Sequence, residues 1–186
     1  MQAPQDFDVK ISEYKRLFAR FNAVHNLSAY DDLSLAINDS IYALNFLNPS
    51  ELKIAIDIGS GAGLPAIFLA LYLKDCEFFL FEPAQKKASF LMLIKSALDL
   101  KNINIKCQKI QNHTAFRADL ICSRAAFKII NLLEISKGFY DEQTLFLLYK
   151  GTSVNNELSE LKSKIKQIKI INQNTRNYTF LKGVLC

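Results

Sequence analysis

The sequence lacks the usual signatures of a metal site, a secreted protein and a membrane span. It holds only four cysteines and two histidines, no two cysteines form a CxxC pair, and neither histidine lies near a cysteine, so zinc-ligand spacing is absent. No apolar run approaches the roughly 20 residues that a membrane span requires, and the polar, acidic N-terminus does not resemble a signal peptide. We therefore expect a cytoplasmic protein that binds no metal and no membrane, with buried free thiols.

The composition fits one compact domain. Half of the 186 residues are hydrophobic and 22% are charged, which suits a full core and excludes a disordered chain. The formal net charge of +5 is compatible with a nucleic-acid partner but does not require one. The sequence does not define the oligomeric state, and a monomer is the simplest expectation.

The chain changes from a helical to a strand pattern at Asn48-Pro49-Ser50. Before this point, apolar residues recur at steps of three and four from Phe7 to Phe21 and from Leu33 to Leu44, which predicts two amphipathic helices. Candidate N-cap residues of the second helix are Asp31 and Asp32. We expect residues 1–50 to form an N-terminal helical extension packed on one compact α/β unit of residues 51–186.

Strands and helices alternate through this second part. The expected strands are Lys53 to Ile58, Glu77 to Phe81, Ile103 to Cys107, Ala118 to Cys122 and Thr144 to Tyr149. The expected helices are Pro65 to Leu73, Gln85 to Leu98, Phe127 to Ser136, and one marked by Leu158, Leu161, Ile165 and Ile168 with a Glu160–Lys164 pair. Strands that are apolar on both faces are typical of a parallel sheet covered by helices on both sides.

The tail predicts two further strands, near Lys169 to Ile171 and Tyr178 to Val184, joined by a polar link as an antiparallel hairpin. We therefore predict an α/β fold with a mostly parallel seven-stranded sheet, a C-terminal antiparallel hairpin and preceding N-terminal helices. This is the layout of the class I, Rossmann-like methyltransferase fold, whereas ordinary nucleotide-binding doubly wound domains stay parallel to the end.

A glycine-rich segment follows the first expected strand and opens the next helix. It runs from Asp57 to Pro65 with the sequence DIGSGAGLP. Glycines allow a sharp turn and let a ligand lie against bare main chain. A phosphate-binding P-loop would end in Gly-Lys-Ser/Thr, and a dinucleotide fingerprint would need glycine or alanine at Leu64, so both classes are disfavoured.

The remaining class is the acid-led D/E-x-G-x-G-x-G turn of methyltransferases. A carboxylate at Asp57 repels a pyrophosphate but suits the ammonium and sulfonium groups of S-adenosylmethionine. The residues expected to contact this cofactor are Asp57, Gly59, Ser60, Gly61, Gly63 and Leu64. A tight turn without a ligand is the alternative.

Two charged residues stand where expected strands end. Glu82 follows the second strand and can accept hydrogen bonds from both ribose hydroxyls; a solvated strand-end carboxylate is the alternative. Arg124, within Ser123-Arg124-Ala125, follows the fourth strand and should face the pocket, because ligands bind beyond the carboxyl ends of strands in open α/β sheets. Its guanidinium could hold a carboxylate or position the acceptor base, or it could pair with a structural acid.

The residues around the end of the fourth strand also limit which kind of atom can accept the methyl group. Methyltransferases of exocyclic amines often carry Asn/Asp-Pro-Pro-aromatic there, and this chain has Ser123-Arg124-Ala125-Ala126 instead. Cys122 has no adjacent proline, so we interpret it as a buried thiol and not as the nucleophile of pyrimidine-carbon methylation. An aromatic nitrogen such as guanine N7 has a free lone pair, and its methylation requires alignment and desolvation without a nucleophile or base.

Three lysines are candidates for contact with RNA phosphate. Lys86 and Lys87 open the helix after the second strand, where they oppose the helix dipole unless an anion is near; a solvated pair is equally compatible. Lys150, before Gly151, lies after the fifth strand at the same ligand-facing edge.

Together these motifs resemble the glucose-inhibited division protein B family (GidB, also RsmG), the bacterial 16S rRNA guanine-N7 methyltransferases. The matching stretches are Asn26-Leu27-Ser28, Asp39-Ser40, Asp57 to Pro65, Lys86-Lys87, Phe90-Leu91, Ser123-Arg124-Ala125 and Lys150-Gly151. They run in family order across nearly the whole chain. The resemblance implies S-adenosyl-L-methionine as cofactor and a guanine in the decoding-region hairpin loop of 16S rRNA, free or in the small ribosomal subunit, as substrate.

The resemblance also implies roles for individual residues. Ile110 and Gln111 would flank the adenine, and Arg124 would line the cofactor pocket. The residues that would face RNA are Asn26, Lys86, Lys87 and Lys150. Ala36 stands where the family often has histidine, and Gln111 where it often has glutamate. A small-molecule methyltransferase and a non-catalytic RNA-binding module with the same fold remain the alternative functions.

Overall fold

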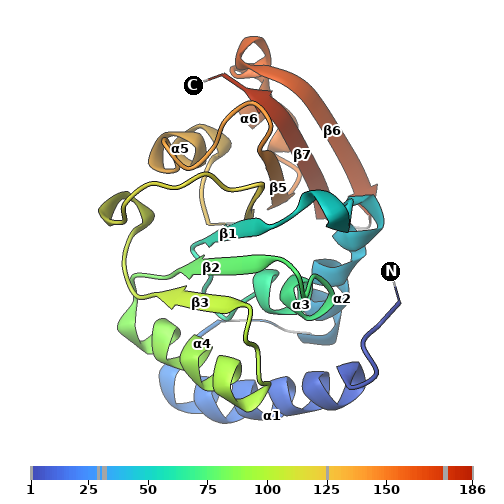
Figure 1. Ribbon diagram of the computed structural model, residues 1–186, viewed down its shortest axis with the longest axis vertical. Helices are drawn as coiled ribbons and strands as arrows, with labels where there is room; N and C mark the ends of the chain where they lie inside the picture. Colours follow the sequence, from blue (N-terminus) through green and yellow to red (C-terminus); the bar gives the residue numbers. More distant parts are fainter. Residues whose placement is uncertain (1, 29, 31–32, 125, 174–175, 186) are drawn as a thin grey trace.

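The protein is built around one seven-stranded sheet, seen in a computed structural model that describes residues 2–28, 30, 33–124, 126–173 and 176–185 (Figure 1). The strand order is β3-β2-β1-β4-β5-β7-β6. The strands are β1 (Ile54–Ile58), β2 (Glu77–Phe81), β3 (Ile103–Lys106), β4 (Leu120–Arg124), β5 (Leu145–Lys150), β6 (Ile165–Gln173) and β7 (Arg176–Val184). Strands β1 to β5 are parallel, and β7 runs antiparallel to both β5 and β6. The predicted fold class is confirmed.

Helices cover both faces of this sheet. They are α1 (Phe7–His25), α2 (Leu33–Tyr42), α3 (Ala66–Tyr72), α4 (Gln85–Ala97), α5 (Ile129–Ile135) and α6 (Val154–Ser159), with short 3-10 helices η1 (Ala43–Phe46), η2 (Pro49–Glu51), η3 (Ile110–Asn112) and η4 (Lys162–Lys164). Side chains of α1 to α4 share one hydrophobic core with alternate residues of the central strands. Side chains of α5, α6 and η3 share a second core with the intervening residues of the same strands, as the period of two in a strand requires.

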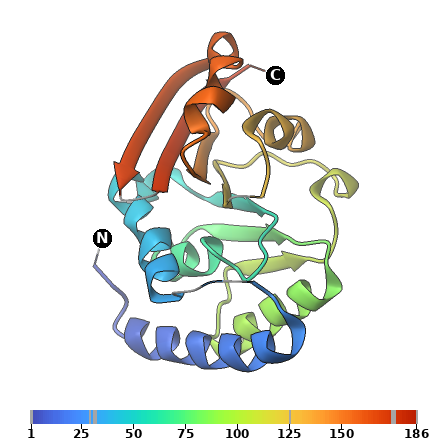
Figure 2. The ribbon, with the colours of Figure 1, turned by 180° about the vertical axis from the view of Figure 1, so that it is seen from behind.

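The N-terminal helices are part of the first core. Seen from behind, α1 runs alongside α4 (Figure 2). Tyr14, Phe18 and Phe21 of α1 all pack against the ring of Phe90 in α4, and Tyr14 also meets Phe68 of α3 edge to face. The division of the chain near residue 50 stays a prediction, because this packing does not test whether either part folds alone.

The predicted helix through Leu158 and Ile168 is wrong. Helix α6 ends at Ser159, a 3-10 turn follows, and Ile165 begins β6 opposite Val184 of β7. The helix therefore stops before the expected Glu160–Lys164 pair, whose contribution of about 0.2–0.5 kcal/mol is small beside a ladder that pairs β6 along its length. The four β-branched isoleucines of this segment, at positions 165, 168, 170 and 171, favour the strand.

Smaller differences concern element ends and coverage. Arg124 and Lys150 are the last residues of β4 and β5, and do not follow these strands. The N-cap candidates Asp31 and Asp32, and Ala125 of the Ser-Arg-Ala motif, lie outside the described residues. Among the described helices, none has the length and apolar character needed to cross a membrane.

Candidate active site

The glycine-rich turn lies at the carboxyl end of the central strand β1. Its first two amides, of Gly59 and Ser60, donate to the carbonyl of Phe81 in β2, at 2.9 and 3.2 Å. Gly59, Gly61 and Gly63 have φ values of 75°, 55° and 88°, in the left-handed region that favours glycine. The turn predicted from the sequence is therefore required by the backbone itself.

The glycines of this turn differ in what surrounds them. A Cβ on Gly63 would lie 2.4 Å from Cγ1 of Ile67 and 3.0 Å from Leu91, so this position serves the packing of α3 and α4. A Cβ on Gly61 would meet nothing nearer than the carbonyl of Gly59, at 3.9 Å. Gly61 therefore presents bare main chain to open space, as a close-lying ligand needs.

This difference predicts opposite outcomes for two alanine variants. Gly63→Ala should destabilise the protein by about 2–4 kcal/mol, because the methyl group overpacks the core in a strained backbone. Gly61→Ala should cost only about 1 kcal/mol of stability, but should weaken binding of S-adenosylhomocysteine. Thermal unfolding and calorimetric titration measure the two effects, with Gly151→Ala, whose Cβ would meet nothing within 4 Å, as control. Equal losses of stability at Gly61 and Gly63 would contradict this assignment.

The glycine turn is held by a hydrogen bond from the first helix and by one within the turn itself. The buried hydroxyl of Tyr14 donates to the carbonyl of Ala62 at 2.7 Å, and the Ser60 hydroxyl donates to the carbonyl of Asp57 at 3.1 Å. Ser60 and Leu64 are almost fully buried. Their side chains lie inside the turn, and their contact with a cofactor stays a prediction. Sequence analysis missed Tyr14, whose place on an apolar helical stripe indicated packing alone.

Asp57 is a buried carboxyl with an unused oxygen. It is 1% exposed, its Oδ1 accepts from Cys122 Sγ at 3.5 Å, and its Oδ2 has no hydrogen-bond partner among the described residues. Burial, together with the nearby charge of Glu82, raises the pKa of Asp57 to about 7, against hydrogen bonds from Ser60 and Cys122 that lower it. A cationic group arriving from outside would satisfy this oxygen and favour the ionised form.

Glu82 is fixed beside the turn. Its side chain is 5% exposed, so it is buried and not the solvated strand-end carboxylate of the alternative. Oε2 accepts from the amide of Gly61 and Oε1 from the amide of Ala84, both at 2.9 Å. The carboxylate thus joins the end of β2 to the turn after β1. Its contact with ribose stays a prediction.

Arg124 pairs with a structural acid, which was the alternative to the predicted pocket-facing role. Its guanidinium donates to Asp39 Oδ2 at 2.7 Å, and to the Ala36 carbonyl and the Ser40 hydroxyl at 2.9 and 3.1 Å. The rings of Tyr30 and Tyr149 lie 5.6 and 5.8 Å away. Arg124 therefore faces α2, and its contact with a cofactor or base stays a prediction.

Asp39 also accepts hydrogen bonds from two residues of the C-terminal hairpin. Arg176 Nε lies 2.8 Å from the same Oδ2, and the Tyr178 hydroxyl donates to Oδ1. We call Asp39, Arg124, Arg176 and Tyr178 the Asp39 cluster. It joins α2, β4 and β7, and sequence analysis found only the Asp39-Ser40 stretch without this role.

Lys150 is also engaged within the protein. Its ammonium lies 2.7 Å from Glu157 Oε2 and donates to the carbonyl of Phe127 at 2.9 Å. Burial alone would raise the pKa of Glu157, but hydrogen bonds from Lys150 and the Ile129 amide outweigh it and lower this pKa. A direct contact of Lys150 with substrate would require this ion pair to open.

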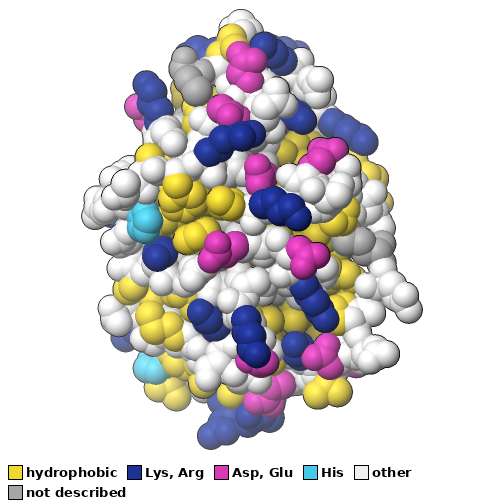
Figure 3. All heavy atoms as spheres, viewed as in Figure 1, with side chains coloured by type: hydrophobic (Ala, Val, Ile, Leu, Met, Phe, Trp, Pro, Cys, Tyr) yellow, Lys and Arg dark blue, Asp and Glu magenta, His cyan; other side chains and the backbone are white. Residues whose placement is uncertain are grey.

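Of the remaining predicted residues, all but Ile110 are exposed or half-buried. Lys86 is exposed and Lys87 half-buried in the first turn of α4, and Asn26 is the exposed C-cap of α1. Ile110 is buried in the second core, whereas its neighbour Gln111 is exposed. Lys and Arg side chains are interspersed with Asp and Glu on the face shown in Figure 3, so no continuous basic surface covers that face.

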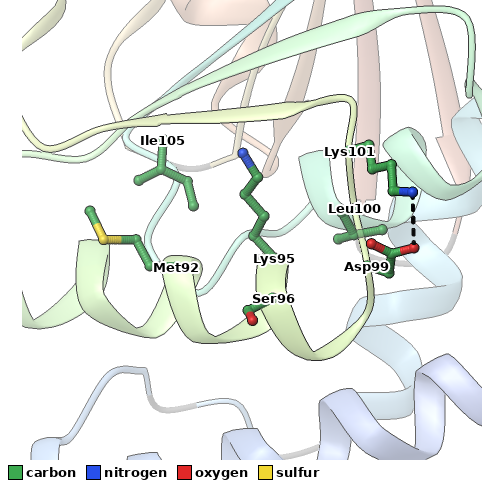
Figure 4. A pocket seen from close by; sticks show the side chains of 7 residues that line it. All are labelled: Met92, Lys95, Ser96, Asp99, Leu100, Lys101 and Ile105. Carbon is green, nitrogen blue, oxygen red and sulfur yellow. Dashed lines mark ion pairs between the residues drawn. The ribbon is translucent and has the colours of Figure 1, made fainter.

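A groove lies away from this site. An open groove of about 430 Å³ separates the later turns of α4 from β3 (Figure 4). It is lined by Met92, Lys95, Ser96, Asp99, Leu100, Lys101 and Ile105. Asp99 to Lys101 precede β3, whereas the glycine turn follows the carboxyl end of β1, and Asp99 pairs with Lys101 at 3.7 Å. Within the described part of the chain, no three His, Cys, Asp or Glu side chains are grouped to hold a metal.

Comparison with known proteins identifies the family. The model of the GidB family, described as rRNA small subunit methyltransferase G, matches residues 8–183. The chain belongs to this family. A GidB relative from Campylobacter fetus subsp. fetus, named ribosomal RNA small subunit methyltransferase G, is 49% identical over 186 residues and all of both chains. The protein of the same name from Campylobacter curvus is 46% identical over 97% of this chain and 94% of its own.

Solved structures confirm the fold of this GidB chain. A SAM-dependent methyltransferase from Aquifex aeolicus superposes with a TM-score of 0.67 at 14% identity, covering 94% of this chain and 98% of its own. A SAM-dependent O-methyltransferase from Thermotoga maritima gives a TM-score of 0.67 at 16% identity, over 80% and 66% of the two chains. At such low identity these likenesses show the fold alone.

Proposed function

We propose that this GidB chain transfers a methyl group from S-adenosylmethionine to N7 of a guanine in the decoding-region hairpin loop of 16S rRNA. One observation carries the proposal: a bare glycine turn, open at Gly61, lies beside a buried carboxyl with an unpaired oxygen, at Asp57. The names of its relatives, which act on small-subunit rRNA, supply the substrate class.

The residues present fit such a cofactor. The unpaired oxygen of Asp57 suits a cationic group, the open main chain at Gly61, after Gly59, suits the amino-acid portion, and Glu82 suits the ribose hydroxyls. Ser60, Gly63 and Leu64 would shape this cradle, and Ile110, Gln111 and Arg124 would border it. When bound, S-adenosylmethionine supplies an electrophilic methyl group on a sulfonium.

The protein groups near the end of β4 fit an acceptor that needs no activation. Cys122 is fully buried, and burial together with the adjacent Asp57 raises the pKa of its thiol well above the ordinary value. A protonated, inaccessible thiol is not a nucleophile. Guanine N7 carries its lone pair without losing a proton, so holding the base in line with the methyl group is the main task left to the protein.

RNA contact would then rest on separate side chains outside the turn. Lys86 and Lys87 stand exposed and half-exposed at the start of α4, directly after Glu82 and its strand. Asn26 offers an exposed amide at the end of α1. Lys150 would act indirectly, by donating to the carbonyl of Phe127, because its ammonium is already paired with Glu157.

The test is methyl transfer to RNA that lacks the modification. Naked 16S rRNA and small ribosomal subunits from a strain without this activity are incubated with the protein and labelled S-adenosylmethionine, and methylated positions are mapped by cleavage at N7-methylguanine. We expect one modified guanine in the decoding-region loop. Methylation at another atom, or of small molecules without RNA, would exclude the proposal. Salt-dependent RNA binding without transfer would support a non-catalytic module instead.

A further inference from the structure

An exposed aromatic ring lies against the glycine turn. Phe127, between β4 and α5, is 38% exposed. A Cβ on Gly59 would lie 3.2 Å from Cε2 of this ring and 3.0 Å from Cβ of Ala126, so the ring touches the first glycine of the turn. Hydrophobic side chains gather between α5 and the carboxyl ends of the central strands (Figure 3), and Ile130, one turn into the same segment, is 47% exposed.

The backbone on both sides of this ring is clamped by a charged pair. Lys150 donates to the carbonyl of Phe127 at 2.9 Å, and Glu157, ion-paired with Lys150 at 2.7 Å, accepts from the amide of Ile129 at 2.9 Å. The two charged side chains are only 9% and 15% exposed. Burying an ion pair carries a desolvation penalty, and leaving a phenyl ring in water forgoes burial energy. Core stability therefore does not explain the exposed ring, whereas the Lys150–Glu157 pair fixes the backbone on both sides of it.

We propose that Phe127 is the surface on which the acceptor base stacks, and that the Lys150–Glu157 pair is its positioning element. This inference rests on the proposed function and specifies how the same site holds its base. The N7 lone pair lies in the plane of the guanine ring, so the methyl donor must approach in that plane. A ring stacked on the face of the base fixes the plane and leaves its N7 edge open.

The stack predicts a selective loss of methyl transfer. Base–aromatic stacking measured by alanine substitution corresponds to a roughly ten- to hundredfold fall in kcat/KM for Phe127→Ala. Binding of S-adenosylhomocysteine should stay within about threefold of the original protein. Phe127→Tyr should retain most activity, and Ile130→Ala, an equally exposed apolar control on the same segment, should retain all of it. Unchanged transfer by Phe127→Ala, or a fall matched by weaker S-adenosylhomocysteine binding, would overturn the inference.

A second measurement reads the stack without turnover. The chain has no tryptophan, so Phe127→Trp introduces a single tryptophan whose emission can be excited selectively over that of the tyrosines. Guanine-containing RNA of the decoding-region loop, added with S-adenosylhomocysteine, should quench its emission by stacking, and Ile130→Trp should respond weakly. Bound RNA, verified by gel shift, with equal emission changes at both positions would contradict stacking on residue 127.

The positioning role is tested by a double-mutant cycle. Lys150→Met combined with Glu157→Gln removes the clamp while keeping the volume, and should lower kcat/KM about tenfold in the original protein. In the Phe127→Ala background the same pair should cause almost no further loss, because the ring it positions is gone. Additive losses would show a merely structural pair. If the original protein methylates no guanine N7, the proposed function itself fails and this inference falls with it; normal N7 methylation by Phe127→Ala rejects the inference alone.

Discussion

Replacing Asp57 with asparagine should weaken S-adenosylhomocysteine binding and methyl transfer while making the unliganded protein more stable at pH 8. The variant keeps the shape of the side chain but cannot carry the negative charge that would meet a cationic cofactor. Loss of a charge-assisted hydrogen bond is worth roughly 10- to 100-fold in affinity. The stability gain follows because an ionised carboxyl at this buried position, with its unpaired Oδ2, is costly without the ligand.

The pH dependence of this effect has a definite sign. The pKa of Asp57 is about 7 in the folded protein and near 3.9 in an unfolded chain. Folding therefore gains from this group fully only below pH 4, and the gain is lost as pH rises through 7. The groups that face Asp57 are Cys122, which donates to its Oδ1, Ser60, whose nearby hydroxyl lowers its pKa, and Glu82, whose charge raises it. The stabilisation by Asp57→Asn should be roughly 1–3 kcal/mol at pH 8 and smaller at pH 5.

Cofactor binding should show the opposite trend. If only the ionised form binds the cation well, S-adenosylhomocysteine affinity of the original protein should rise up to about tenfold from pH 6 to pH 8, and binding at pH 6 should release a proton. Titration calorimetry in two buffers measures both, with Asp99→Asn on the surface as control. Equal affinity at both pH values, or an unstable Asp57→Asn protein, would contradict the role given to this carboxyl.

Replacing Asp39 with alanine should destabilise the protein by about 3–5 kcal/mol. The substitution removes the acceptor of Arg124, Arg176 and Tyr178 at once. Arg124, whose side chain is 7% exposed, would then carry a buried charge with no carboxylate partner. Such a loss is a large share of the 5–15 kcal/mol that holds a typical domain folded.

Urea unfolding followed by circular dichroism measures this change. Asp39→Asn keeps one acceptor oxygen and should lose less, so a stability value remains measurable if the alanine variant does not fold. The matched control is Asp99→Asn, which also tolerates the left-handed backbone at this position (φ 50°). The pair of Asp99 with Lys101 is 3.7 Å long and joins side chains that are 78% and 86% exposed; such pairs contribute little. A loss at Asp39 no greater than at Asp99 would show that the Asp39 cluster does not support the fold.

The parts of the fold that the sequence predicted best depend on local patterns. Strand β2 was expected at its observed bounds, Glu77–Phe81, because a short, phenylalanine-rich apolar run between turn residues is typical of a buried strand. The turn from Gly59 to Gly63 was also predictable, since positive φ values restrict the residue type. By contrast, the spacing of Leu158, Leu161 and Ile165 fits a helical stripe, and only pairing with β7 decides that β6 begins there.

The candidate site was less predictable, because its contacts join distant segments. Arg124 and Asp39 are 85 positions apart, and nothing local in either segment shows that they pair. The sequence placed Lys150 near the carboxyl end of the fifth strand but could not show that Glu157 lies beside its ammonium. Phe127 was expected only as the start of a helix, and its contact with Gly59 depends on how two loops meet.

The hydrogen bond from Tyr14 to Ala62 has a consequence for the order in which the molecule assembles. A buried carbonyl without a donor is unfavourable, so docking of the first helix stabilises the turn in its observed shape. During synthesis the amino-terminal end of a chain emerges first. Helix α1, which carries the Tyr14 hydroxyl, is therefore already outside the ribosome when the glycine turn appears. The donor for the Ala62 carbonyl is available before the turn forms.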